Sequence, residues 1–92
     1  MMITAHFHGI LADWVGVPSA VFELPAGATL ADLMQAIGRR YRSNMPDQLW
    51  DHQTDSFKKQ VRAQGAATVY NDLNMQLEKG EDITFMLMIA GG

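Results

Sequence analysis

The feature that most constrains the fold is one amphipathic helix, predicted between stretches that otherwise alternate in the manner of β-strands. Thr29 lies three residues ahead of Asp32, which is close to a capping box and predicts that the helix begins there. From that point one apolar stripe follows helical spacing, made of Leu30, Leu33, Met34, Ile37 and Tyr41. Three arginines, Arg39, Arg40 and Arg42, occupy the last turn, where positive charge complements the helix dipole. A helix with one apolar stripe can lie against a sheet, which the surrounding strands must supply.

Two strands are predicted before the helix. From Met2 to Gly9, apolar residues alternate with polar ones at the period of two that is typical of a half-buried strand. Residues 19–24 alternate in the same way, and the two segments favour an antiparallel hairpin. The residues between them, 11–18, are interpreted as a connection, because Gly16 and Pro18 interrupt regular structure. Trp14 in this connection is expected to cover the core.

The chain after the helix is predicted to complete the sheet. Residues 43–65 are the least regular part, with Leu49 and Trp50 as an apolar anchor and residues 57–64 as a short helix. Three strands are predicted beyond them, at residues 66–70, 75–77 and 83–89. The last strand should face the helix with Ile83, Phe85, Leu87 and Ile89, and pair in parallel with the first strand at the centre of the sheet. These elements predict an α+β domain in which a mixed sheet of four to five strands packs on one main helix.

Composition narrows the classes of function. The chain has 92 residues, which fits a single domain spanning residues 1–92 with one core. A formal net charge of -3 argues against a nucleic-acid partner, because neutralising phosphates needs a basic face. The absence of cysteine leaves no disulfide, thiolate metal site or cysteine nucleophile. No segment is apolar for long enough to cross a membrane and no secretory signal is present, so we expect a cytoplasmic protein.

The chain ends in Gly91 and Gly92, directly after the last apolar strand. Residues 89–92 are predicted to form a flexible C-terminal tail without side chains beyond Ala90. Fully extended, four residues reach roughly 13 Å, so such a tail could enter a narrow channel in another protein. Chains also commonly end in glycine without a function, so the dipeptide alone leaves both interpretations open.

The order and spacing of several segments resemble the MoaD/ThiS family of sulfur carriers, which are β-grasp proteins similar in fold to ubiquitin. The opening Ile3-Thr4-Ala5-His6-Phe7 is followed by residues 11–17, residues 24–33 and Gly80-Glu81-Asp82-Ile83-Thr84-Phe85, which leads to Ala90-Gly91-Gly92. The resemblance covers nearly the whole chain. The length of residues 43–65 makes it nearer to the small subunit of molybdopterin synthase than to thiamine-pathway carriers.

The resemblance implies a chemistry carried by the C-terminus. An ATP-dependent, ubiquitin-activating-type adenylyltransferase would adenylate Gly92, and a persulfide would convert the adenylate to a thiocarboxylate. Ile89, Ala90 and Gly91 would then enter the active site of a larger molybdopterin synthase-type subunit, or of another sulfur acceptor. In this scheme the chain binds no cofactor and performs no catalysis alone, and ATP is used by the activating partner.

Both partners need a surface on the folded domain. We predict that His8, Phe85, Met86 and Met88 contact them, because flexible methionines near the tail suit more than one partner. A metal site made of His6, His8 and His52 is conceivable, but the pattern favours no metal. The acidic residues Asp72, Glu78, Glu81 and Asp82 are expected to form a solvated rim without acid-base chemistry.

Other functions remain open on sequence alone. The carrier could serve thiamine, a tungsten cofactor or a specialised metabolite instead of molybdopterin. A ubiquitin-like modifier would use the same activation but would attach Gly92 to a lysine amine. A binding-only β-grasp module would not use its terminal glycines at all.

Overall fold

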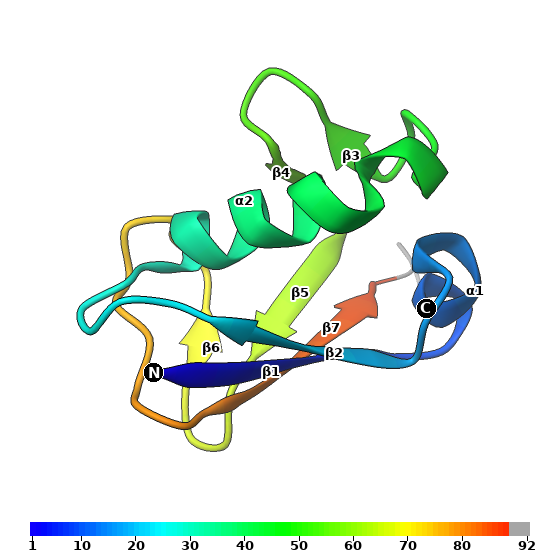
Figure 1. Ribbon diagram of the computed structural model, residues 1–92. Helices are drawn as coiled ribbons and strands as arrows, with labels where there is room; N and C mark the ends of the chain where they lie inside the picture. Colours follow the sequence, from blue (N-terminus) through cyan, green and yellow to red (C-terminus); the bar gives the residue numbers. More distant parts are fainter. Residues whose placement is uncertain (89–92) are drawn as a thin grey trace.

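A computed structural model describes residues 1–88 of the chain (Figure 1). Its elements in chain order are β1 (Met2–Phe7), α1 (Ile10–Val15), β2 (Ser19–Glu23), α2 (Leu30–Tyr41), the 3-10 helix η1 (Arg42–Asn44), β3 (Trp50–Asp51), β4 (Ser56–Phe57), β5 (Val61–Gln64), β6 (Val69–Tyr70) and β7 (Asp82–Leu87). Five strands form one mixed sheet in the order β2-β1-β7-β5-β6, and β3 and β4 form a separate hairpin. The predicted α+β class, with a mixed sheet and one main helix, is confirmed.

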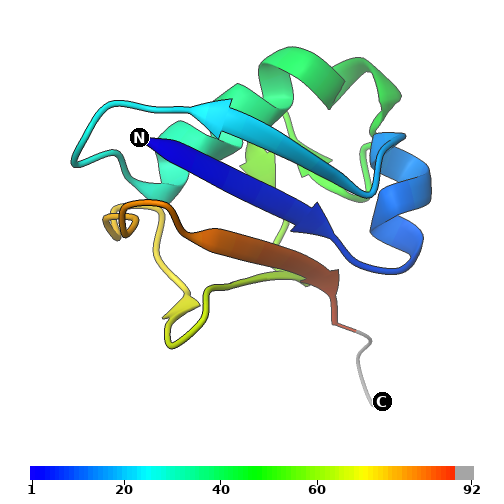
Figure 2. The ribbon, with the colours of Figure 1, turned by 60° about the horizontal axis from the view of Figure 1, so that its bottom comes forward.

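The centre of the sheet is the pair formed by β1 and β7. These strands run in parallel, with Ala5 opposite Ile83 and Phe7 opposite Phe85, as the sequence predicted. On either side β1 pairs antiparallel with β2, and β7 pairs antiparallel with β5 (Figure 2). On the face towards α2, the alternating apolar residues of β1 are buried, as are Ile83 and Phe85 of β7, while Leu87 is half-buried. The last strand before the tail is therefore held between two neighbours.

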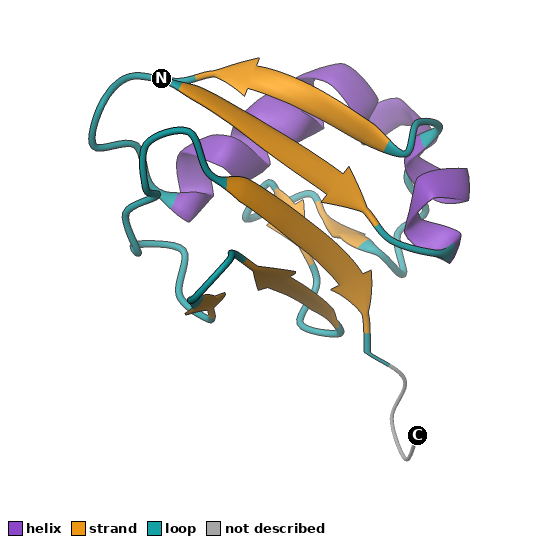
Figure 3. Ribbon diagram, turned by 90° about the horizontal axis from the view of Figure 1, so that it is seen from below, coloured by secondary structure: helices purple, strands orange, loops and turns teal. Residues whose placement is uncertain are grey.

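Helix α2 begins and packs as its sequence predicts. Thr29 and Asp32 form a complete capping box, in which Thr29 N–H donates to the Asp32 carboxylate at 2.9 Å and Asp32 N–H donates to Thr29 Oγ1 at 3.4 Å. The helix lies across one face of the sheet (Figure 3). It buries the side chains of Leu30, Leu33, Met34 and Ile37. The capping box fixes where the helix starts, and the stripe fixes which side faces the sheet.

The basic cluster at the end of α2 has local roles. The Arg40 guanidinium lies 4.2 Å from the centre of the Phe22 ring, which is a cation–π contact between the helix and β2. Arg42 lies 3.6 Å from the Asp55 carboxylate on the β3–β4 hairpin. The hairpin approaches the helix closely at Gly38, where an added Cβ would lie 2.8 Å from both Trp50 Cζ2 and Asp55 Oδ1. Trp50 is buried, so the predicted apolar anchor is confirmed.

Four local expectations are wrong. Residues 11–18 are not a plain connection, because residues 10–15 form helix α1, which ends at Gly16 with a φ of 102°. Residues 57–64 form no helix; they contain the end of β4 and the whole of β5, whose register with β7 decides their conformation. The strand expected at residues 66–70 is limited to Val69 and Tyr70. The strand expected at residues 75–77 is reduced to one bridge between Gln76 and Thr29.

Glu81 is also not part of a solvated rim. Its side chain is buried and accepts hydrogen bonds from the Tyr70 hydroxyl and from Glu78 N–H, the latter at 3.1 Å. Burial of the Tyr70 hydroxyl, followed by its hydrogen bond to the Glu81 carboxylate, raises the pKa of Tyr70 well above its usual value. The backbone carbonyl of Glu81 accepts a hydrogen bond from Thr4 N–H at 3.1 Å. The residue with the buried carboxylate therefore also makes a backbone hydrogen bond to β1 at the start of the β1–β7 pair.

Candidate functional site

The carboxyl end of β7 is the place from which residues 89–92 continue the chain. His8 N–H, just beyond β1, donates to the Phe85 carbonyl at 2.9 Å. Met88 N–H donates to the Gln60 carbonyl, just before β5, at 2.6 Å. The backbone is therefore fixed from both sides up to Met88, the last described residue. A partner that binds the residues after Met88 would therefore find the backbone held in place at Met88.

The sheet face opposite α2 carries Met86, one of the predicted docking side chains. The register places His6 opposite Thr84 and Met86 opposite Arg62, and side chains at paired positions project from the same face. His8 is exposed, Met86 is half-buried, and Met88 is 43% exposed. These three residues are accessible to different degrees near the end of β7, and a docking role for them stays a prediction.

Phe85 is not available for docking. Its side chain is 0% exposed and projects into the core, where its ring stacks on that of Phe7 with centroids 5.9 Å apart. The ring also lies 5.2 Å from that of Phe57. The prediction that Phe85 contacts a partner is wrong, because strand alternation places its side chain on the opposite face from Met86. Its role is to anchor β7 to the core.

The four residues expected to enter a partner, Ile89, Ala90, Gly91 and Gly92, lie outside the described residues. Their roles stay predictions. Among residues 1–88, no group of three or more His, Asp or Glu side chains could hold a metal ion. His6 lies instead 3.1 Å from Asp82, and His52 lies 3.4 Å from Asp47. Within the same residues, no helix has the length and apolar character that spanning a bilayer needs.

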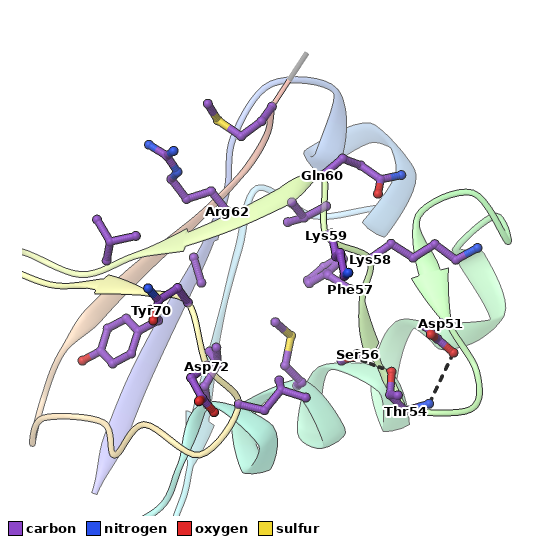
Figure 4. Close-up of a pocket in the computed structure, with 18 residues that line it drawn as sticks. Asp51, Thr54, Ser56, Phe57, Lys58, Lys59, Gln60, Arg62, Tyr70 and Asp72 are labelled. Atoms are coloured by element: carbon purple, nitrogen blue, oxygen red, sulfur yellow. Dashed lines mark hydrogen bonds between the residues drawn. The ribbon is translucent and has the colours of Figure 1, made fainter. Parts of the chain in front are cut away.

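A groove that the sequence did not predict lies on the helix side of the sheet, between α2 and β5 (Figure 4). It has a volume of about 980 Å³, and Met88 borders it. Leu30, Met34 and Phe57 supply apolar walls, and the segment from Lys58 to Arg62 runs along it. The one sequence signal for it is the mixture of basic and apolar residues at positions 57–64, a pattern that by itself favours a short helix.

The acidic side chains of this groove accept hydrogen bonds from backbone N–H groups of residues that follow them closely in the sequence. The Asp51 carboxylate accepts hydrogen bonds from Gln53 N–H at 2.9 Å and Thr54 N–H at 3.3 Å. These backbone hydrogen bonds, with a smaller contribution from the charge of Lys58, hold the pKa of Asp51 below its usual value. Asp72 accepts a hydrogen bond from Asn74 N–H at 2.8 Å. Lys59 and Arg62, in contrast, form no ion pair with any of residues 1–88.

No protein-family model matches the chain, and no curated protein matches it in sequence. Solved structures, however, share its fold along nearly the whole chain. SAMP1 from Haloferax volcanii has a TM-score of 0.80 at 12% identity, with 100% of each chain covered. The molybdopterin converting factor subunit 1 candidate from Pyrococcus furiosus has a TM-score of 0.71 at 17% identity, covering 97% of this chain and 99% of that one.

A chain of the Amycolatopsis orientalis BexX/CysO complex has a TM-score of 0.68 at 17% identity, covering 98% of this chain and 99% of that one. At such identities the likeness establishes the fold. The protein has the β-grasp fold of ubiquitin-like proteins and sulfur carriers, and the predicted resemblance is confirmed at that level.

Proposed function

We propose that the protein is a sulfur carrier whose C-terminal Gly92 is adenylated and converted to a thiocarboxylate, which then donates sulfur in molybdopterin synthesis. The observation that carries the proposal is the anchoring of β7 on both sides. His8 N–H donates to the Phe85 carbonyl of β7, and Met88 N–H donates to the carbonyl of Gln60 just before β5, so the chain beyond Met88 starts at a fixed point on the domain. The fold shared with a molybdopterin converting factor candidate supports the same assignment.

The proposed chemistry needs little from the folded domain other than a fixed position for the start of the C-terminal tail. A carboxylate is a poor electrophile, so ATP held by an adenylyltransferase must first convert it to an acyl-adenylate with release of pyrophosphate. Attack by a persulfide sulfur at the acyl carbon releases AMP, and reduction of the acyl disulfide by a thiol leaves the thiocarboxylate. The residues of this chain contribute the reactive end, the narrow Ala90-Gly91 approach and a docking surface that includes Met86 and Met88.

The most direct test of activation uses the purified adenylyltransferase of the host and the exchange of labelled pyrophosphate into ATP. The unmodified chain should support exchange, and a chain with one residue appended after Gly92 should not, because the free carboxylate is displaced. A chain with the same residue inserted at the exposed turn beside Gly27 is the matched control. Equal exchange with both chains would contradict the proposal.

A ubiquitin-like modifier is the second candidate, because SAMP1, a small archaeal modifier protein, shares the fold at a TM-score of 0.80. Activation would be the same, but a lysine amine would attack the acyl carbon and form an isopeptide bond. Conjugates that carry the Gly92 carbonyl on lysine, isolated from the native host, would favour the modifier over the carrier.

A further inference from the structure

Strand β2 forms an open edge of the sheet. Among the described residues it pairs with β1 alone, as the outermost strand of the order β2-β1-β7-β5-β6 (Figure 2, cyan). Met1 and Leu24, at the end of this antiparallel pair, exchange both backbone hydrogen bonds at 2.6 and 2.8 Å. Hydrogen-bonded positions alternate along such a pair, so Ala20 and Phe22 direct their N–H and C=O groups to β1. The residues of β2 whose backbone groups point away from the sheet are therefore Ser19, Val21 and Glu23.

The outward backbone groups of β2 form no hydrogen bond with any of residues 1–88. Proteins commonly protect a sheet edge with a very short strand, a bulge, a proline or a lysine. Strand β6, at the opposite edge, has two residues only. Strand β2 instead pairs with β1 over five residues without a bulge, and it contains neither proline nor lysine. Its central residue, Val21, is 45% exposed. This edge can therefore accept one more strand.

A positive charge lies beside this edge. Arg40 of α2 is exposed, and its stacking on the Phe22 ring, 4.2 Å from the ring centre, holds its guanidinium on the α2 side of β2. Arg40 forms no ion pair with any of residues 1–88, whereas Arg42 approaches Asp55. The acid of β2, Glu23, projects from the opposite face of the sheet, because it is adjacent to Phe22 in the strand.

Strand geometry defines the side chains that an added strand should carry. Paired residues project from the same face, with Cβ atoms about 4.5–5.5 Å apart. A residue opposite Phe22 would lie on the α2 side within reach of the Arg40 guanidinium, so an acid there would form an ion pair. A residue opposite Val21 would lie beside an exposed apolar side chain, and a residue opposite Glu23 would lie beside a negative charge. The edge therefore favours a segment in which acids flank a central apolar residue and bases lie further out.

We propose that the β2 edge binds such an extended segment of a partner protein, which would extend the sheet beyond β2. A second copy of this chain fits less well. Antiparallel pairing of two β2 strands about Val21 would place Ala20 opposite Phe22 and would supply no carboxylate to Arg40. Strand β1 separates this edge from β7, so a bound segment would leave the start of the tail accessible. The proposal does not depend on the proposed function.

The test is an NMR titration of the isotope-labelled protein with the capped peptide Thr-Lys-Glu-Val-Glu-Lys-Thr as the probe. This sequence is the same in both directions, so it presents a glutamate to Arg40 in either strand orientation. We expect a Kd below about 1 mM, with large shifts of the outward amides of Val21 and Glu23. The matched peptide Thr-Glu-Lys-Val-Lys-Glu-Thr has the same composition and net charge with the charges exchanged. It should bind at least about fivefold more weakly.

Variants of the protein separate the ion pair from general charge effects. Arg40→Glu should abolish the preference for the first peptide, and combining it with Glu23→Lys, which restores the net charge, should reverse the preference. Arg39→Glu, at the neighbouring exposed residue, should keep it. Val21→Pro removes the central outward N–H and should abolish binding of both peptides. Circular dichroism checks that each variant folds. Equal affinities of the two peptides for the unmodified protein, an unchanged preference in the charge-exchanged variant, or shifts confined to residues outside β2 would overturn the proposal.

Discussion

Replacing Gly65 with alanine should destabilise the protein by displacing the buried Glu81 carboxylate. A Cβ at Gly65 would lie 2.0 Å from Glu81 Oε2 and 2.9 Å from its Cδ, closer than non-bonded atoms approach. The end of the Glu81 side chain must then move, and it loses the hydrogen bonds from the Tyr70 hydroxyl and Glu78 N–H. A hydrogen bond to a charged group contributes about 1.5–3 kcal/mol, and the abandoned Tyr70 hydroxyl remains buried.

We therefore expect Gly65→Ala to lower the free energy of unfolding by about 3 kcal/mol, a large part of the stability of a small domain. In a chain of this length the melting temperature should fall by about 15 °C. Urea unfolding followed by circular dichroism measures the first quantity, and calorimetry measures the second. Ala66→Gly, at the neighbouring exposed position, controls for effects of the turn.

A double-mutant cycle isolates the cause. In a Glu81→Ala background the carboxylate is absent, so Gly65→Ala should cost less than about 1 kcal/mol. Equal costs of Gly65→Ala in both backgrounds would refute the reasoning, because the clash with Glu81 would then contribute nothing. The cycle also tests whether this carboxylate stabilises the start of β7, where the Glu81 carbonyl bonds to Thr4 N–H.

Three further predictions concern pH, the helix cap and docking. The pKa of Tyr70 is raised in the folded state, so the Tyr70 hydroxyl contributes fully to the free energy of unfolding at pH values below its unfolded pKa of about 10. This contribution is lost as the pH rises above that value. The stability difference between the native chain and Tyr70→Phe, measured by urea unfolding, should therefore narrow above pH about 10; a constant difference would argue against the buried hydroxyl. Thr29→Ala should cost about 1 kcal/mol in the same assay while Thr29→Ser costs little, because only serine keeps the capping box. Met88→Asp should reduce adenylation of Gly92 about tenfold, whereas Val21→Asp, at a residue 45% exposed on the far edge strand, should not; equal rates would remove Met88 from the docking surface.

Sequence patterns that extend over several helical turns, or over several alternating residues of a strand, predicted the secondary structure and its buried face correctly. The stripe and cap of α2 and the alternation of β1 and β7 specify both an element and its buried face, and from them the central parallel pair follows. Helix α1 was missed because six residues are too few for a clear period. Its signal was nevertheless present, because Leu11 and Val15 lie four residues apart and Gly16 follows as the C-cap.

Short segments depended on distant parts of the chain. Val61 and Ala63 alternate with Arg62 and Gln64 for only four residues, and pairing with β7 makes them a strand. The groove could not be predicted, because it depends on where β6 stops and on how the β3–β4 hairpin rests on Gly38. Phe85 shows the reverse case, since strand alternation alone places it in the core.

The central claim is that Gly92 carries sulfur, and intact-mass measurement of the protein from its native host tests it most directly. The account predicts a population heavier than the unmodified chain by the mass difference between sulfur and oxygen, with the change located at Gly92 by fragmentation. This population should disappear when the adenylyltransferase is deleted. A single unmodified mass in both strains, under conditions of active molybdopterin synthesis, would contradict the account.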